Sequence, residues 1–63
     1  MTHFSAILKA LRTENGLTQA QIADDLGVSQ SAIYYWENGK REPNFETLDK
    51  IISYFNISKK ISL

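Results

Sequence analysis

The sequence has no cysteine, so neither a disulfide bridge nor a thiolate metal site can contribute to its fold or function. It has a single histidine, His3, which cannot form a zinc site alone. We therefore expect no metal and no other cofactor. Its apolar runs are too short for a signal peptide or a membrane span, and we expect a soluble cytoplasmic protein with no membrane partner.

An excess of positive charge is also missing. Seven Lys and Arg residues balance seven Asp and Glu residues, and the formal net charge is zero. This balance disfavours a strong non-specific polyanion binder, because such binding depends on a positive surplus. Any nucleic-acid site would have to come from local clustering of charge rather than from the total.

The 63 residues suffice for one domain, residues 1–63, with a compact core. Gly16, Gly27 and Gly39 each follow a segment with helical periodicity, which is where a left-handed helix end favours glycine. No strand-like alternation of apolar and polar residues is present. The sequence therefore predicts an all-α fold of four to five short helices.

The first and last of these helices should form the walls of the core. The first runs from about His3 to Glu14 with Thr2 at its capping position, and its apolar stripe is Phe4, Ile7, Leu8 and Leu11. The last is capped by Asn44, and its core side chains are Phe45, Leu48, Ile51, Ile52 and Phe55. After Asn56 the apolar pattern fades, and the remaining segment is too short to assign.

Residues 19–38 carry the clearest local signals. Thr18 and Gln21 have the spacing of a capping box at the start of one helix, and Ser29 can cap the next. Gly27 stops the first of these helices only two residues before that second cap. The two short helices must therefore cross steeply, as they do in helix-turn-helix units.

The second helix of this unit, from about Gln30 to Asn38, has an unusual outward face. Helical geometry turns Ile33, Trp36 and Glu37 toward the core and Ser31, Tyr35 and Asn38 away from it, with Tyr34 on a flank and Gln30 at the exposed start. This outward set has no acid. Glutamine can pair with adenine, serine can donate or accept, and a ring can pack on a thymine methyl, so the set suits reading of the major groove.

Residues that are suited to contact DNA phosphates flank this face. Gln19 stands beside the free backbone N–H groups at the start of its helix, a suitable seat for one phosphate. Lys40 and Arg41 precede the last helix, where they could hold a second.

The run from Leu11 to Pro43 resembles the Cro and phage-repressor family of helix-turn-helix regulators, which are XRE-like. The resemblance rests on small Ala23, turn Gly27, buried Ile33 and Trp36, and the Glu-Asn-Gly helix end. It implies a phosphate contact and a brace for Gln30 from Gln19. It also implies an ion pair between Arg12 and Glu37.

With this resemblance, we predict a sequence-specific transcriptional regulator of double-stranded DNA, with repression as the expected mode. The predicted base contacts are Gln30, Ser31, Tyr35 and Tyr34. The predicted backbone contacts are Gln19, Thr18, Asn38, Lys40, Arg41 and Asn44. A single copy makes few phosphate contacts, so a homodimer on two half-sites is expected, acting at the nucleoid.

These residues also admit other interpretations. Ile33, Trp36, Phe45 and Phe55 should form core rather than a ligand pocket, and Asp24 and Asp25 a solvated face rather than paired catalytic carboxylates. We expect no enzyme, because no nucleophile, base and orienting group occur together. The alternative function is a protein-interaction module of the same fold, such as an antitoxin or anti-repressor, favoured by zero net charge and two exposed tyrosines.

Overall fold

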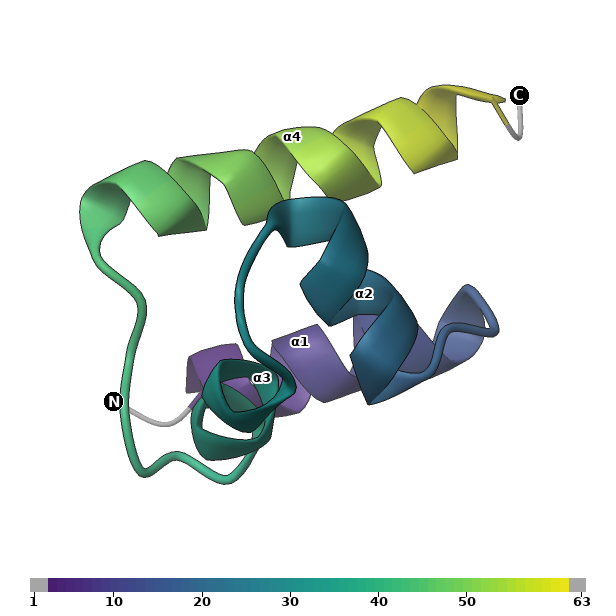
Figure 1. Cartoon of the computed structure of the whole chain (residues 1–63). Coiled ribbons are helices and arrows are strands. Elements are labelled where there is room, and N and C mark those ends of the chain that lie inside the picture. Colours follow the sequence, from purple (N-terminus) through teal and green to yellow (C-terminus); the bar gives the residue numbers. More distant parts are fainter. Residues whose placement is uncertain (1–2, 62–63) are drawn as a thin grey trace.

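A computed structural model describes the backbone of residues 3–61 and the side chains of residues 4–56. It contains four helices: α1 (His3–Glu14), α2 (Gln19–Leu26), α3 (Gln30–Glu37) and α4 (Phe45–Ile61). No strand occurs within residues 3–61, and the all-α prediction is confirmed (Figure 1). Thr2, the expected cap of the first helix, lies outside the described residues.

The predicted caps start three of the helices. The Thr18 Oγ1 accepts from the Gln21 N–H at 3.0 Å, and the Gln21 side chain accepts from the Thr18 N–H at 2.8 Å, which completes the capping box. The Ser29 Oγ accepts from the Ala32 N–H at 3.1 Å at the start of α3. Asn44 caps α4 in the same way. These side chains satisfy backbone donors that have no partner inside a helix.

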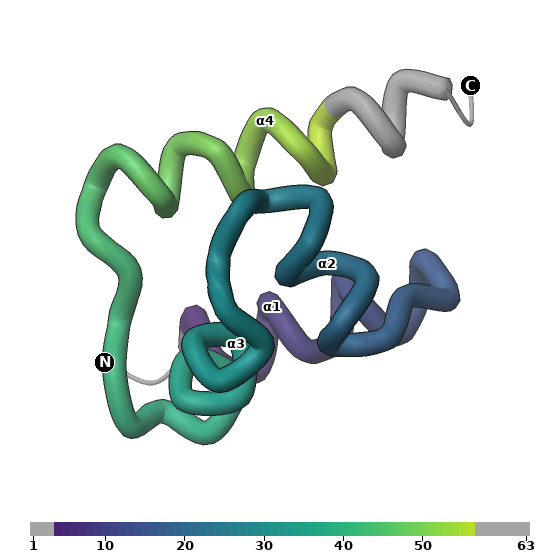
Figure 2. The backbone as a smooth tube through the Cα atoms, in the orientation of Figure 1, coloured from purple at the N-terminus to yellow at the C-terminus, as the bar shows by residue number. Residues whose placement is uncertain are grey.

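Gly27 makes the tight turn between α2 and α3 possible. Its φ is +72°, in the left-handed region that side chains rarely adopt. The Gly27 N–H donates to the Asp24 carbonyl at 3.2 Å and the Val28 N–H to the Ala23 carbonyl at 3.0 Å, which closes the end of α2. The chain therefore turns within three residues, and α3 runs steeply across the direction of α2 (Figure 2).

The core lies where the four helices meet. Helix α3 packs against both α1 and α2, and α4 packs against α2. The buried apolar side chains are Leu8, Ile22, Ala23, Leu26, Ile33, Trp36, Ile51 and Phe55. The predictions that Ile33, Trp36 and Phe55 belong to the core are confirmed. Burial of these side chains between short helices supplies the main stabilising free energy.

Three residues predicted to line the core are exposed. Phe45 is 89% exposed, Ile7 54% and Ile52 50%, so their assignment to the core was wrong. Periodicity gives the apolar side of a helix but not the neighbour that covers it. Because α4 packs on α2, the side chains of α4 and α1 that face each other leave an open cleft. Phe45 is the first residue of α4.

This cleft, called here the apolar groove, has a volume of about 330 Å³. Its lining residues are Phe4, Ile7, Leu8, Leu11, Leu48, Ile51, Ile52, Phe55 and Asn56.

Helix α4 is longer than the sequence predicted, because it continues from Asn56 to Ile61. No glycine or proline stands in that stretch, so nothing in the backbone interrupts the helix although the apolar pattern fades. Residues 3–61 contain four helices and no fifth. None of the helices in this described part is long and apolar enough to cross a bilayer.

Candidate nucleic-acid interface

A buried ion pair fixes α3 on the rest of the domain. The Arg12 Nε donates to the Glu37 Oε2 at 2.6 Å and Nη2 donates to Oε1 at 3.1 Å, with the two side chains 13% and 2% exposed. Arg12 Nη1 also donates to the Leu17 carbonyl at 2.9 Å. The hydrogen bond to Glu37 raises the pKa of Arg12 above its ordinary value. The pair thus ties the end of α1, the following turn and the end of α3 together.

Gln19 joins this network from the start of α2. Its Nε2 donates to the Glu37 Oε1 at 3.2 Å, so the Glu37 carboxylate accepts hydrogen bonds from two different helices. Gln19 was expected to brace Gln30, but in the part of the chain that the structure describes their side chains form no hydrogen bond with each other. The Gln19 partner was missed because the two residues lie 18 apart in sequence, and no local pattern indicates it.

The outward side of α2 and α3 forms a shallow depression of about 300 Å³, called here the polar hollow. Its lining residues are Gln19, Gln30, Ser31, Tyr34 and Tyr35. All four residues predicted to contact bases lie here together, and none of the lining side chains is charged. Tyr34 is 47% and Tyr35 40% exposed. The surface offers amide, hydroxyl and ring groups to a partner, without a fixed charge of either sign.

The loop after α3 adds a cation to the edge of this hollow. The ring centroids of Tyr34 and Tyr35 lie 5.8 Å apart at 65°, an edge-on arrangement. The Arg41 guanidinium carbon lies 5.7 Å from the Tyr35 ring centroid, within the range of a cation–π contact. A second hollow, of about 330 Å³, shares Ser31 and Tyr35 with the first and extends to Arg41 and Asn44.

Three of the residues predicted to contact the DNA backbone line these hollows, and some of the set are engaged within the protein. Thr18 and Asn44 cap helices through their side-chain oxygens. The Asn38 Nδ2 donates to the Tyr34 carbonyl at 2.8 Å, and Asn38 is exposed. Lys40 and Arg41 are both exposed. Among the predicted backbone contacts, Gln19, Arg41 and Asn44 thus border the two hollows, and Thr18, Asn38 and Lys40 are exposed.

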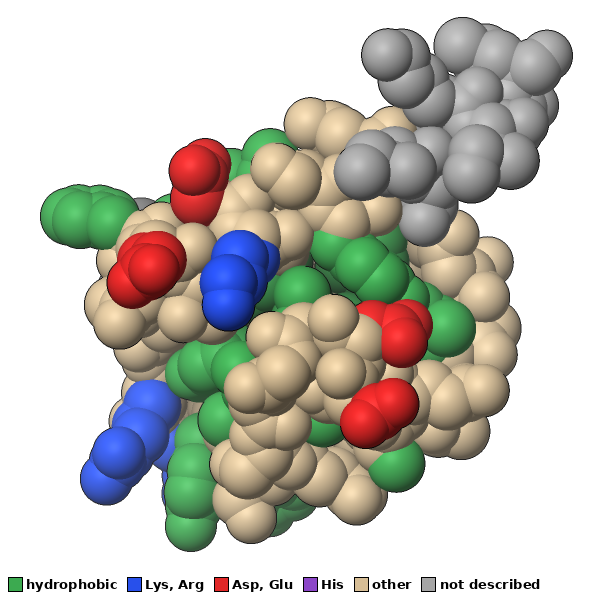
Figure 3. Space-filling model, turned by 45° about the horizontal axis from the view of Figure 1, so that its top comes forward, with side chains coloured by type: hydrophobic (Ala, Val, Ile, Leu, Met, Phe, Trp, Pro, Cys, Tyr) green, Lys and Arg blue, Asp and Glu red, His purple; other side chains and the backbone are tan. Residues whose placement is uncertain are grey.

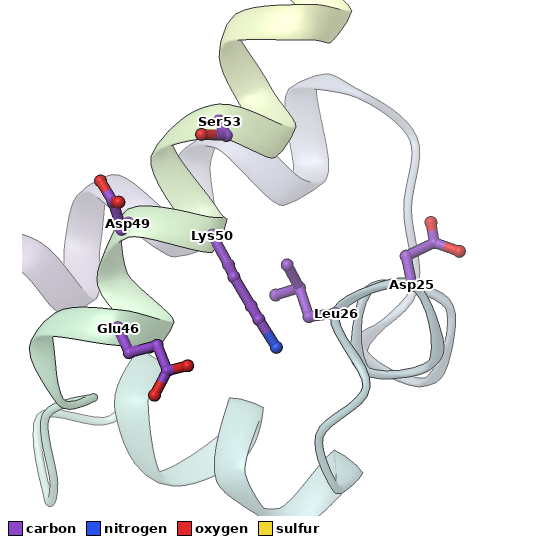
Figure 4. Close-up of a pocket in the computed structure, with 6 residues that line it drawn as sticks. All are labelled: Asp25, Leu26, Glu46, Asp49, Lys50 and Ser53. Atoms are coloured by element: carbon purple, nitrogen blue, oxygen red, sulfur yellow. The ribbon is translucent and has the colours of Figure 1, made fainter.

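A different hollow, between α2 and α4, has the opposite character (Figure 4). It is lined by Asp25, Leu26, Glu46, Asp49, Lys50 and Ser53. Lys50 extends across it, whereas Asp25 and Asp49 turn away from Lys50 at its edges (Figure 4). Three carboxylates against one ammonium repel phosphate. Within the described part of the chain, no three carboxylates or histidines are placed to hold a metal ion.

Asp25 has a structural partner that the sequence did not indicate. The Tyr54 hydroxyl donates to the Asp25 Oδ2 at 2.7 Å, across 29 residues of sequence. Burial, with this hydrogen bond, raises the pKa of Tyr54 to about 12. Both Asp24 and Asp25 are exposed, in agreement with the solvated face expected for them. On the face in Figure 3, acidic side chains lie in two separate small groups, apart from the basic side chains, and no single patch of one sign covers the face.

Comparison with known proteins identifies the family. A family model described as helix-turn-helix matches residues 8–60. The chain is 46% identical over 55 residues to the HTH-type transcriptional activator BcrR of Enterococcus faecalis, covering 87% of this chain and 27% of that protein. It is 30% identical over 54 residues to the cryptic phage CTXphi transcriptional repressor RstR of Vibrio cholerae, covering 86% and 49%.

The antitoxin PezA of Streptococcus pneumoniae is 35% identical over 51 residues, which are 81% of this chain and 32% of that protein. The chain thus spans less than half of the length of each of these relatives. No solved structure matches it. Since the family model covers most of the sequence, the chain belongs to the helix-turn-helix family, as its resemblance to the Cro and phage repressors predicts.

Proposed function

We propose that the chain is a sequence-specific DNA-binding transcriptional regulator that inserts α3 into the major groove. The observation that carries this proposal is the polar hollow, where Gln30, Ser31, Tyr34 and Tyr35 meet on an exposed helix face without a charged side chain. Base edges display hydrogen-bond donors, acceptors and a thymine methyl, and these groups match amide, hydroxyl and ring. Two relatives named as transcriptional regulators support it.

In this proposal the residues of the polar hollow contact different base pairs. Gln30 and Ser31 stand at the start of α3 and meet base edges first, with Gln30 suited to a bidentate pair with adenine. Tyr34 and Tyr35, one turn further along, present ring edges and hydroxyls to the adjacent base pairs. No acid lines the polar hollow itself, so its own side chains do not repel the phosphates beside it, although Glu42 lines the neighbouring hollow.

The surrounding polar and basic residues hold the duplex in register. Thr18 and Gln19 at the start of α2 contact one phosphate, and Asn38, Lys40, Arg41 and Asn44 contact the backbone beyond α3. These contacts carry no sequence information but fix the orientation of α3. The chain acts at the nucleoid in the cytoplasm. One relative is named an activator and another a repressor, and repression stays our prediction.

We further propose that two copies bind together. Lys40 and Arg41 follow α3 and are exposed, and contacts from so few cations give a single copy a low affinity for DNA. Two copies on half-sites about one helical turn apart double these contacts and account for a palindromic operator.

Selection of bound duplexes from a random DNA pool tests the proposal. The expected result is a palindromic consensus, bound with an affinity that falls steeply as salt is raised, because phosphate contacts release counterions. If no sequence is enriched, even at salt concentrations low enough to favour binding, sequence-specific recognition is contradicted. A consensus without symmetry keeps the DNA-binding proposal and removes the paired copies.

A second candidate function is a protein-interaction module. The relative PezA is named an antitoxin, and two exposed tyrosines suit a protein interface. The same salt titration separates the candidates, because a protein partner held by ring and amide contacts is far less salt-sensitive than DNA held through phosphates.

A further inference from the structure

Two adjacent cations follow α3, and only one of them meets an aromatic ring. The Arg41 guanidinium lies over the Tyr35 ring at 5.7 Å, while among the described residues Lys40 has no such ring contact. Tyr35 in turn meets Tyr34 edge-on at 5.8 Å, so two rings and one cation form a continuous row. The row runs from the polar hollow on α3 to the loop before α4.

We propose that Tyr35 is a positioning residue, whose ring holds the Arg41 guanidinium in place for a DNA phosphate. This inference rests on the proposed function and deepens it. Tyr35 then contributes to DNA binding in two ways, through its own contact with the bases and through the placement of Arg41. The sequence-reading face and this backbone contact therefore act as one unit.

The physical reason lies in the side chain of arginine. A long exposed side chain loses rotamer freedom when it binds, and a side chain already held against a ring loses less. A guanidinium over a ring uses its π face there and keeps its N–H groups for a phosphate. Arg41 has this advantage and Lys40 lacks it, although both are exposed and adjacent.

A double-mutant cycle on the full chain measures the coupling. The variants are Tyr35→Leu and Arg41→Ala, singly and together, with affinity measured on the selected duplex. Leucine removes the ring and preserves helix propensity. The combined loss should be smaller than the product of the single losses by roughly two- to fivefold, the worth of an exposed cation–π contact.

Two matched variants provide the controls. Lys40→Ala combined with Tyr35→Leu should give losses that multiply, because Lys40 has no ring to lose. Tyr35→Phe keeps the ring and should retain the coupling to Arg41. Thermal unfolding of each variant confirms that the fold is intact, which is expected because Tyr35 and Arg41 are surface residues.

An independent readout needs no DNA. In the NMR spectrum of the free chain, the side-chain protons of Arg41 should be shifted by the ring current, and Tyr35→Leu should abolish the shift whereas Tyr35→Phe preserves it.

Two results would overturn the positioning role while DNA binding by the wild type stands. One is that the losses of DNA affinity from Tyr35→Leu and Arg41→Ala multiply in the double variant. The other is that the chemical shifts of the Arg41 side-chain protons stay the same in Tyr35→Leu. A wild type that binds no duplex overturns the proposed function itself, and the positioning role with it.

Discussion

The two hollowed sides of this domain are built from the same core but differ in chemistry. The polar hollow on α2 and α3 is lined only by amide, hydroxyl and ring side chains. The apolar groove between α1 and α4 is lined by aliphatic and aromatic side chains and a single asparagine. Directed hydrogen bonds select a partner by its pattern of donors and acceptors, whereas apolar surface does not.

The two sides also differ in how they are held. Beneath the polar hollow, Glu37 accepts from Arg12 and Gln19, so three helices are joined at one buried carboxylate. In the apolar groove, the lining side chains of Ile7 and Ile52 are half-exposed. A reading surface needs a fixed geometry, and the buried network supplies it where it is needed. Four experiments on single substitutions test this contrast.

The largest expected effect is on the ion pair. Arg12→Ala should lower the free energy of unfolding by about 3–5 kcal/mol, because it leaves the Glu37 carboxylate buried without its cation. Urea denaturation followed by circular dichroism measures the loss. Lys9→Ala, on the exposed side of the same helix, is the matched control and should stay within about 0.5 kcal/mol. Equal effects of the two variants would show that the polar hollow has no such anchor.

The next effect compares two neighbours at the groove. Leu8 is 1% exposed and Ile7 54%, although both belong to the predicted apolar stripe. Leu8→Ala should cost about 2–5 kcal/mol of unfolding free energy through the cavity that it leaves. Ile7→Ala should cost less than about 1 kcal/mol, since its side chain is already half in water. Similar losses in denaturation would mean that the groove is filled in solution.

A smaller effect separates base reading from backbone contact. Gln30→Ala should weaken binding to the selected duplex by about 1–3 kcal/mol and relax one base position. Lys40→Ala should instead weaken binding to all duplexes alike and lower the salt slope by about one. Titrations against matched and mismatched duplexes, at several salt concentrations, measure both. If the two variants gave the same sequence-independent loss, the division of roles would be wrong.

The smallest effect concerns the α2–α4 contact. Tyr54→Phe should cost about 1 kcal/mol at neutral pH through the lost hydrogen bond to Asp25. Because the folded-state pKa of Tyr54 is raised to about 12 from 10.0, the stability that this group contributes is full below pH 10 and is lost between pH 10 and 12. The difference between wild type and variant in denaturation should shrink over that range, and a constant difference would contradict the assignment.

Much of the α2–α3 unit could be predicted from the sequence because its signals are local. The Thr18–Gln21 capping box, the Ser29 cap and the left-handed Gly27 each involve residues within a few positions of one another. The outward set on α3 follows from the helical repeat alone. The pairing of Arg12 with Glu37 was reached only through the family resemblance, since the two residues lie 25 apart in sequence.

The rest depends on how α4 sits, and local patterns do not contain that information. The exposure of Phe45 and Ile52 follows from packing of α4 on α2, and a stripe of apolar residues does not indicate which of them a neighbour covers. The contacts of Gln19 with Glu37 and of Tyr54 with Asp25 likewise join distant segments. Periodicity therefore predicted where the helices lie in the sequence better than it predicted which residues pack against one another.

The most direct test of the central claim is an NMR titration of the chain with the selected duplex, mapped residue by residue. If α3 reads the bases, the largest amide and side-chain shifts occur at Gln30, Ser31, Tyr34 and Tyr35. Residues of the apolar groove such as Ile7 and Ile52 should stay unchanged. If the largest shifts occurred at residues of the apolar groove and those of the polar hollow did not change, base reading by α3 would be contradicted.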